Sequence, residues 1–137
     1  MSIRDNQIKK SIDYSKKLLN KTSTDFQHFA FIYRKNKLLS IGQNDPTSTN
    51  AKSRKLAKRF GAKKPLVYPY IHAEIDAISK LWGKLYIDKI FTLVSIRLNR
   101  HGELRISKPC KDCQIVLSSL CIPVIFYDGK NFNDTKF

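Results

Sequence analysis

Two short patterns of residues carry the chemistry that this sequence can perform. His72 is followed by Ala73 and Glu74, and Cys110 and Cys113 form a Cys-x-x-Cys motif directly after a proline. Zinc favours imidazole nitrogen and thiolate sulfur, and a catalytic zinc site uses three protein ligands with water in the fourth position. The two patterns supply three ligands, and no second Cys-x-x-Cys is present to close a structural site. This count predicts an open, catalytic zinc held by His72, Cys110 and Cys113.

Glu74 predicts the proton chemistry of such a site. It follows His72 by two residues, so on a helix the two side chains are rotated from each other and need not compete for the metal. A carboxylate beside a metal-activated water can take its proton and later deliver it to a leaving group. Attack of hydroxide on an amidine-like ring carbon, followed by loss of ammonia, is hydrolytic deamination, and this residue set indicates that reaction.

The same residue types have simpler interpretations. A lone Cys-x-x-Cys also occurs in redox pairs and as half of a structural zinc knuckle, but the H-x-E pattern and the proline before Cys110 favour the catalytic site. His28 begins an apolar stretch and is interpreted as a packed or edge residue rather than a ligand. His101 lies in a turn and is expected to be exposed. Cys121 precedes a strand and is interpreted as a small buried apolar residue.

The elements that must position these residues alternate between helix and strand. Apolar spacing predicts a helix from Ser2 to about Asn20, and β-rich runs predict a hairpin over residues 28–42. Each metal pattern is expected to open a helix, one starting at His72 and one over residues 110–120. The other predicted elements are a helix over 49–60, strands over 90–96, 122–127 and 131–136, a turn at 99–102 in an excursion ending at Pro109, and a hairpin turn at Asp128 and Gly129. This order predicts an α/β protein with a mixed sheet flanked by helices.

The paired motifs resemble those of the zinc-dependent cytidine deaminase-like family, whose signature is H-x-E followed by P-C-x-x-C. Within that family the chain is most similar to small deoxycytidylate deaminase-like proteins of bacteriophages, which also carry a basic helix before H-A-E and a K-P-C-x-x-C motif. The resemblance implies a three-layer sandwich with a central sheet of about five strands. It implies that His72, Cys110 and Cys113 bind zinc and that Glu74 is the proton shuttle.

The resemblance also implies substrate contacts and an assembly. Gly42, Gln43 and Asn44 resemble a G-x-N turn whose asparagine reaches the substrate, and Ala73 matches a small residue whose backbone lies against the base. The turn at Asp128 and Gly129 suggests a closing antiparallel hairpin, as in the cytidine deaminase branch. Pockets in that branch are often completed by a neighbouring subunit, so a homo-oligomer is expected. Neither an extra cysteine nor a histidine cluster suggests a second, regulatory zinc site.

Composition limits the class of protein. The 137 residues are enough for one compact domain, expected to span residues 1–137. The chain is 42% hydrophobic, which is typical of a globular protein rather than a disordered basic tail. It shows neither the roughly 18 consecutive apolar residues of a membrane span nor a secretory signal. Three cysteines favour a reducing compartment. We expect a soluble cytoplasmic protein with no membrane partner, in the host cytoplasm if the chain is encoded by a phage.

The charge points to an anionic partner. Lysine and arginine number 26 and acidic residues 11, which gives a formal net charge of +15. Residues 52–64 alone hold seven basic residues and no acid. A mononucleotide phosphate needs only two or three basic groups, and the candidates for this contact are Lys52, Lys55, Lys58 and Arg59. The excess charge also fits a solvated face or a surface that tracks single-stranded nucleic acid.

Three functional hypotheses follow. The first is a zinc hydrolase that deaminates a cytosine nucleotide, with dCMP converted to dUMP. The second is a deaminase that acts on cytosine or adenine within single-stranded DNA or RNA. The third is a non-catalytic zinc protein that binds nucleic acid, although a scaffold would have no need of the Glu74 carboxylate.

Overall fold

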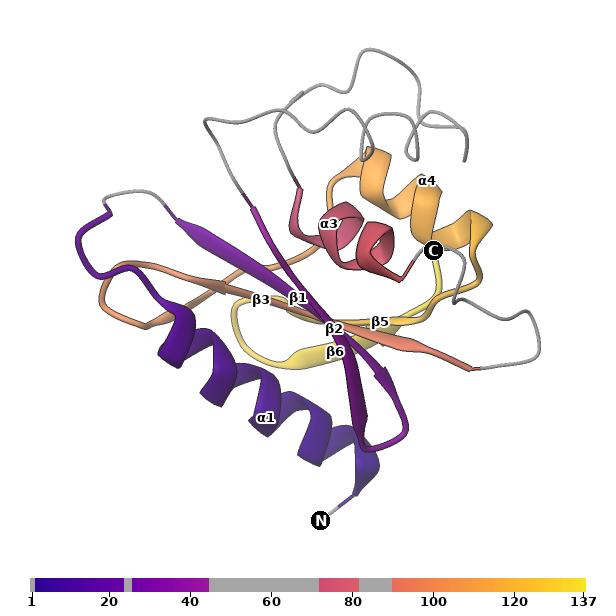
Figure 1. The fold of residues 1–137 in the computed structure, drawn as a ribbon, viewed down its shortest axis with the longest axis horizontal. Coiled ribbons are helices and arrows are strands. Elements are labelled where there is room, and N and C mark those ends of the chain that lie inside the picture. Colours follow the sequence, from indigo (N-terminus) through magenta and orange to yellow (C-terminus); the bar gives the residue numbers. More distant parts are fainter. Residues whose placement is uncertain (1, 24–25, 45–71, 82–89) are drawn as a thin grey trace.

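The fold is built on one mixed β-sheet. The computed structural model describes residues 2–23, 26–44, 72–81 and 90–137. The strands within these residues are β1 (Gln27–Arg34), β2 (Lys37–Gln43), β3 (Thr92–Leu98), β4 (Leu104–Arg105), β5 (Val124–Tyr127) and β6 (Phe132–Thr135). The sheet order is β2-β1-β3-β5-β6, and β4 pairs with β3 beside this path. Only β3 and β5 run parallel, and the other pairs are antiparallel. The predicted α/β class with a mixed sheet is therefore confirmed (Figure 1).

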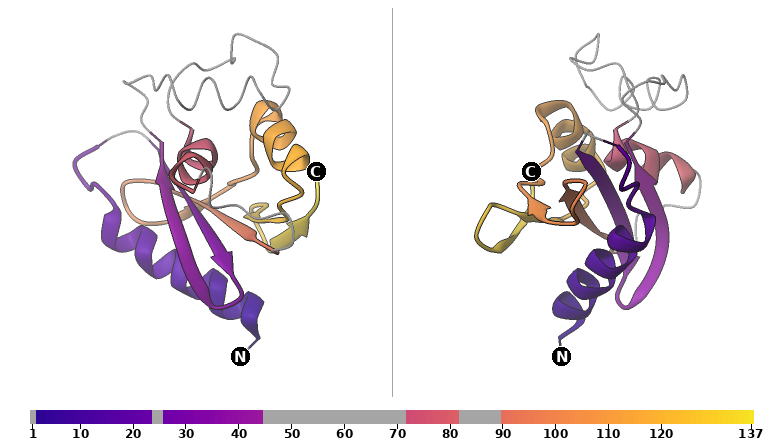
Figure 2. Two further views of the ribbon diagram at one scale, coloured as in Figure 1. Left: turned by 45° about the vertical axis from the view of Figure 1, so that its right-hand side comes forward. Right: turned by 90° about the vertical axis from the view of Figure 1, so that its left-hand side faces the viewer.

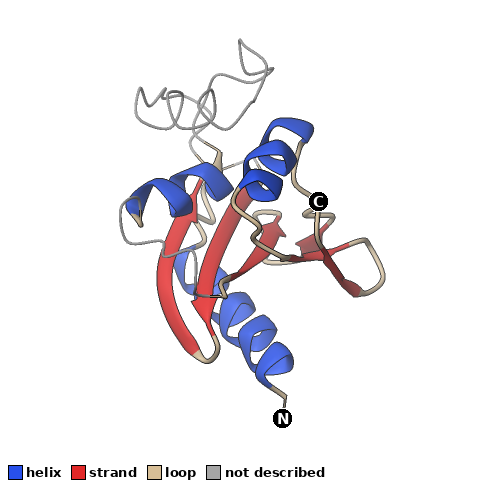
Figure 3. Cartoon of the chain, turned by 90° about the vertical axis from the view of Figure 1, so that its right-hand side faces the viewer, coloured by secondary structure: helices blue, strands red, loops and turns tan. Residues whose placement is uncertain are grey.

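In the described part of the chain, three helices cover the two faces of this sheet. Helix α1 (Ile3–Leu18) lies on one face, and α3 (Ala73–Lys80) and α4 (Lys111–Ser119) lie on the other (Figures 2 and 3). The result is the predicted three-layer arrangement. None of the helices in the described part of the chain has the length and apolar character that a membrane crossing requires.

Strict alternation along β1 assigns side chains to the two layers. Phe29, Phe31 and Tyr33 are buried in a cluster with residues of α1, whereas Ala30 and Ile32 are buried in a second cluster with α3 and α4. Successive side chains of a strand point to opposite faces. His28 therefore belongs to the same face as Ala30, which is the face covered by α3 and α4. We call the two sides the α1 face and the α3/α4 face.

Helix α1 begins and packs as its sequence predicts. The Ser2 hydroxyl caps it by accepting a hydrogen bond from the Asp5 backbone nitrogen at 3.0 Å. Ile8 and Ile12 pack against the aromatic side chains of β1. Ser11 is fully buried, and its hydroxyl lies 2.9 Å from the hydroxyl of Tyr33. This bond satisfies both groups and fixes the helix on the sheet.

On the other face, β2 and α3 approach so closely that only glycine fits between them. A Cβ atom built on Gly42 would overlap the Ala73 carbonyl oxygen and would lie 2.5 Å from the Ala77 backbone nitrogen. The Ser40 hydroxyl reinforces the contact by donating to the Ala77 carbonyl oxygen at 2.8 Å. The contact brings the end of β2 against the first turns of α3, where the H-x-E motif lies.

One sequence prediction requires correction, and one short strand was not predicted. The five strands of the main sheet path are joined by β4, because residues 104–105 in the predicted excursion pair with β3. Cys121 is exposed rather than buried. It follows α4 in the left-handed conformation, with φ of 55°, and its backbone nitrogen bonds to the Ser118 carbonyl while that of Ile122 bonds to the Leu117 carbonyl. This is the Schellman pattern that ends many helices, with cysteine where glycine is usual.

The other predicted elements that lie within the described residues agree with the structure to within a few residues. The hairpin of β1 and β2, the central strand, the helix after Cys110 and the closing β5–β6 hairpin all form. In that last hairpin Gly129 has φ of 105°, a conformation open to glycine and costly for other residues. The predicted helix over 49–60 lies outside the described residues.

Candidate metal and catalytic site

Two helix N-termini meet at the site. His72 is the N-cap of α3 and Cys110 is the N-cap of α4, both with extended backbone and neither using its side chain as a cap. Cys113 lies in the first turn of α4 and is fully buried. The Gln114 side chain donates to the Pro109 carbonyl oxygen at 2.8 Å and so holds the turn before the first cysteine. The positive ends of two helix dipoles favour thiolates here.

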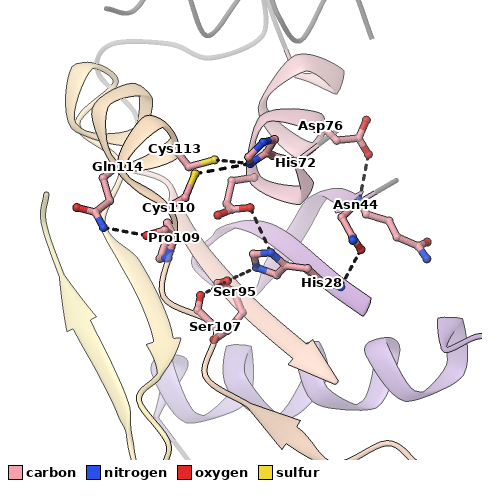
Figure 4. A network of polar contacts seen from close by, with 12 residues as sticks. His28, Asn44, His72, Asp76, Ser95, Ser107, Pro109, Cys110, Cys113 and Gln114 are labelled. Carbon is pink, nitrogen blue, oxygen red and sulfur yellow. Dashed lines mark hydrogen bonds and ion pairs between the residues drawn. The ribbon is translucent and has the colours of Figure 1, made fainter. Parts of the chain in front are cut away.

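The ligand atoms of His72, Cys110 and Cys113 have the spacing that zinc requires. His72 Nδ1 lies 3.6 Å from Cys110 Sγ and 3.5 Å from Cys113 Sγ (Figure 4). All three atoms lie within 4.8 Å of one another. Tetrahedral bonds of about 2.3 Å to sulfur and 2.0–2.1 Å to nitrogen place a nitrogen and a sulfur ligand about 3.6 Å apart. The three residues that the sequence selected therefore could hold one zinc ion without rearrangement.

The two cysteines differ in their readiness to ionise. A hydrogen bond from the Cys113 thiol lowers the pKa of Cys110, and the contact with His72 lowers it further. The same Cys110–Cys113 hydrogen bond, together with burial and the nearby Glu74 carboxylate, raises the pKa of Cys113. The two thiols therefore titrate as a coupled pair in which Cys110 is the more acidic.

Glu74 is an unusually costly residue in this position. Its side chain is 2% exposed, and among the described residues its Oε1 atom is buried with no hydrogen-bond partner. Burying a carboxylate oxygen without a hydrogen bond costs about 1–3 kcal/mol or more. Such a group lowers the stability of the fold, so its presence beside three potential metal ligands indicates a chemical role.

A residue that the sequence did not select approaches that oxygen. His28 Nδ1 lies 3.5 Å from Glu74 Oε1. The other ring nitrogen, Nε2, lies 2.6 Å from the Ser95 hydroxyl, and Ser95 donates to the Ser107 carbonyl oxygen at 2.7 Å. Ser107 returns a bond of the same length to the Ser95 carbonyl oxygen. Figure 4 shows His28 reaching across from β1 between this serine pair and the metal cluster.

Comparison with known proteins agrees with this geometry. No protein-family model matches the chain, and no curated protein matches it in sequence. Among solved structures it is similar to a cytidine deaminase from Burkholderia pseudomallei, with a TM-score of 0.56 and 14% sequence identity over 93% of this chain and 87% of that one. This chain has the cytidine deaminase fold. The His-Cys-Cys cluster that it carries is compatible with zinc-dependent deamination.

Within this deaminase fold, Asn44 lies beside His28 at the end of β2. Its side-chain oxygen accepts a hydrogen bond from the His28 backbone nitrogen at 2.8 Å, and its own backbone nitrogen bonds to the His28 carbonyl oxygen at 3.1 Å. Next to it, the Gln43 backbone nitrogen donates to the Asp76 carboxylate at 3.1 Å. These bonds fix the Asn44 side chain between β1 and α3.

Of the other predicted substrate contacts, one lies within the described residues and four lie outside them. Ala73 is fully buried at the close contact with Gly42. Its main chain follows His72 directly. The predicted phosphate-binding residues Lys52, Lys55, Lys58 and Arg59 lie outside the described residues. His101 lies exposed in a turn, as expected, and takes no part in the site.

Proposed function

We propose that the protein is a zinc-dependent hydrolase that deaminates a cytosine nucleotide, with dCMP converted to dUMP. His72, Cys110 and Cys113 would hold the zinc ion, and Glu74 would move the proton. The observation that carries this proposal is the buried Glu74 carboxylate with an unpartnered oxygen beside three ligand atoms at zinc-like spacing. The cytidine deaminase fold supports it.

The reaction needs a nucleophile and a group that moves protons. Cytosine and water give uracil and ammonia, so one oxygen replaces the amino nitrogen at the ring carbon. Zinc, when bound, supplies Lewis acidity that makes water nucleophilic near neutral pH. Glu74 takes one proton from the attacking water and gives it to the ring nitrogen, and it then takes the second proton from the new hydroxyl on the ring carbon and gives it to the departing amino nitrogen. A carboxylate can serve in both directions because it is the base in the first step and its conjugate acid in the second.

Asn44 and Ala73 would orient the nucleotide. Because the Asn44 carbonyl oxygen accepts from the His28 backbone, this side chain would offer a ligand its amide hydrogens, which suit a hydroxyl or carbonyl oxygen. The backbone at Ala73 would lie against the base, next to the ligand His72. Fixed polar groups of this kind contribute to rate by holding the reacting atoms in place.

The phosphate of dCMP is assigned from charge. Residues 52–64, just before His72, hold seven basic residues, and two or three of them suffice for one phosphate. The charge left over keeps single-stranded nucleic acid as the second candidate substrate, since a chain with net charge +15 attracts polyanions strongly.

A substrate panel tests the proposal. Zinc-loaded protein is mixed with dCMP, CMP, deoxycytidine, dCTP and a single-stranded oligonucleotide containing one cytosine, and ammonia release is followed. We expect fastest turnover of dCMP. Glu74→Gln should lower kcat by about 10²- to 10⁴-fold with bound zinc unchanged by elemental analysis. Turnover of the oligonucleotide alone would move the substrate to the polynucleotide class. Absence of turnover on every substrate with zinc bound would reject a cytosine deaminase.

A further inference from the structure

We propose that His28 is a positioning residue for Glu74, which sets the direction in which the carboxylate faces the reacting water. This inference rests on the proposed function and extends it to a residue outside both motifs. It starts from the 3.5 Å approach of His28 Nδ1 to Glu74 Oε1, the buried oxygen without a hydrogen-bond partner among the described residues.

Hydrogen-bond accounting fixes the orientation of the His28 ring. A serine hydroxyl carries one hydrogen, and that of Ser95 goes to the Ser107 carbonyl oxygen at 2.7 Å. The Ser95 oxygen must then accept from His28, so Nε2 carries the hydrogen in their 2.6 Å contact. The ring is therefore held by Nε2 and turns its other nitrogen, Nδ1, toward Glu74.

The support behind His28 is rigid. Ser95 and Ser107 are 0% and 1% exposed and bond to each other in both directions, each hydroxyl to the other's carbonyl. The Ser107 hydroxyl also accepts from the Tyr127 backbone nitrogen at 2.9 Å, so strands β3 and β5 both hold the serine pair. On its other side, His28 is fixed through its backbone by Asn44. A group that must place another within a fraction of an ångström needs such support.

The distance between the two groups indicates an interaction that tightens during the reaction. At 3.5 Å the nitrogen and the oxygen are too far apart for a good hydrogen bond. Catalytic hydrogen bonds are often long in unliganded proteins and shorten during the reaction. With its hydrogen on Nε2, the neutral His28 ring can only accept at Nδ1, so a hydrogen bond between the two groups forms once Glu74 carries the proton that it takes from water. His28 is 19% exposed on its side chain and so lies at the edge of the buried site, where it restrains Glu74 from one side.

Two amide substitutions separate positioning from simple packing. The side chain of asparagine ends near the place of Nδ1, whereas glutamine reaches the place of Nε2. His28→Asn therefore keeps a polar atom toward Glu74 and loses the Ser95 bond, and His28→Gln does the reverse. We expect His28→Gln to lower kcat for dCMP by about 10- to 100-fold, because misplacement of a reacting group by about 1 Å can cost 10²-fold. His28→Asn should lower kcat for dCMP by less than about 10-fold. KM and zinc content should stay at the wild-type values in both.

The exposed residue His101 supplies the control, since His101→Gln should leave kcat unchanged. If His28 only fills space and satisfies Ser95, His28→Gln will be the more active of the pair, and that order overturns the proposal. Equal kcat for wild type and His28→Gln also overturns it. If wild type turns over no substrate at all, the proposed function fails instead, and the two failures are thus distinct.

A second measurement needs no activity. In a nitrogen-15 spectrum of the histidine rings, His28 should carry a hydrogen on Nε2, and Ser95→Ala should change the shift of that nitrogen. A bare Nε2 in the wild-type protein would contradict the hydrogen-bond accounting, whatever the substrate proves to be.

Discussion

The two faces of the central sheet bury different kinds of side chain. The α1 face is filled by large apolar side chains, including Phe29, Phe31, Val94 and Ile96, all fully buried. The α3/α4 face also has a large apolar core, but it combines small residues such as Ala30 and Ala73 with a buried sulfur and carboxylate and with half-buried imidazoles. Small side chains let α3 approach the sheet, and this approach brings the H-x-E motif within reach of the cysteines on α4. Both faces contribute buried apolar area, and the α3/α4 face also holds the candidate site.

Strand β1 serves both faces through its alternation. Its odd-numbered residues from Phe29 to Tyr33 are aromatic and pack under α1, and its even-numbered residues, from His28 to Ile32, lie under α3 and α4. A shift of one residue in the pairing of this strand would exchange the two sets. The strand register therefore decides which side chains of β1 lie on each face, and three changes test how the two faces differ.

The largest effect, a loss of zinc and of turnover, is expected from substitution of the buried cysteine Cys113. Cys113→Ala removes a fully buried residue of the proposed ligand set, so we expect the purified protein to lose its zinc on dialysis and all turnover with it, since two ligands bind zinc far more weakly than three. Cys121→Ala, at the exposed end of α4, is the matched control and should keep one zinc per chain by elemental analysis. Retention of stoichiometric zinc by Cys113→Ala would contradict the assigned ligand set.

A smaller but still large effect should follow from one added methyl group. Gly42→Ala would force β2 away from α3, because the new Cβ overlaps the Ala73 carbonyl oxygen. We expect a loss of at least about 3 kcal/mol in the free energy of unfolding, the upper end for overpacking. Phe31→Leu, on the α1 face, should cost about 1.5 kcal/mol and leave kcat of the folded protein unchanged. Chemical denaturation measures both, and equal losses would show that the two faces tolerate change alike.

The smallest effect concerns pH on the α1 face. Burial raises the pKa of the Tyr33 hydroxyl, although the bond with Ser11 lowers it in part. A raised folded-state pKa contributes stability that is full below the unfolded value of about 10 and is lost as the pH rises through the folded value. Tyr33→Phe should cost about 1 kcal/mol at pH 8 through the lost Ser11 bond. That difference should shrink above pH 10 in urea unfolding, whereas a difference that is constant with pH would rule out Tyr33 as the titrating group.

The sequence predicted most of the fold because its signals are local. Ser2 and Asp5 mark the start of α1, the run from Phe29 to Tyr33 marks a buried strand, and Asp128 and Gly129 mark the last hairpin. Helix ends, turns and buried strands depend on neighbours within a few positions. Strand β4 was missed because two residues inside a polar excursion carry no periodic pattern. Cys121 was misjudged because the conformation that turns it outward is set by the end of α4 and not by its apolar character.

The site was predictable only in part, for a physical reason. The three candidate ligands and Glu74 stand in two compact motifs, so their types and spacing sufficed to select them. His28 forms no motif, and its partners Glu74, Ser95 and Ser107 come from distant parts of the chain. Alternation along β1 could have shown that His28 shares a face with Ala30, but only the packed structure shows what it meets there. The homo-oligomer and the phosphate contacts of residues 52–64 stay predictions.

The paired hydrogen bonds of Ser95 and Ser107 also bear on how this chain can change. They hold the two ends of the segment 96–106 next to each other. The path of the chain from β3 to the Pro109 turn therefore does not depend on the length of the loop at the other end of this segment. Residues 99–103 form the tip of that loop, a turn closed by its own bonds, with Asn99 accepting from the backbone of His101 and Glu103. Insertions at such exposed tips are tolerated most readily. Residues 99–103 are thus the place where evolution or an engineer can add a binding segment without disturbing the spacing between the cysteines and His72.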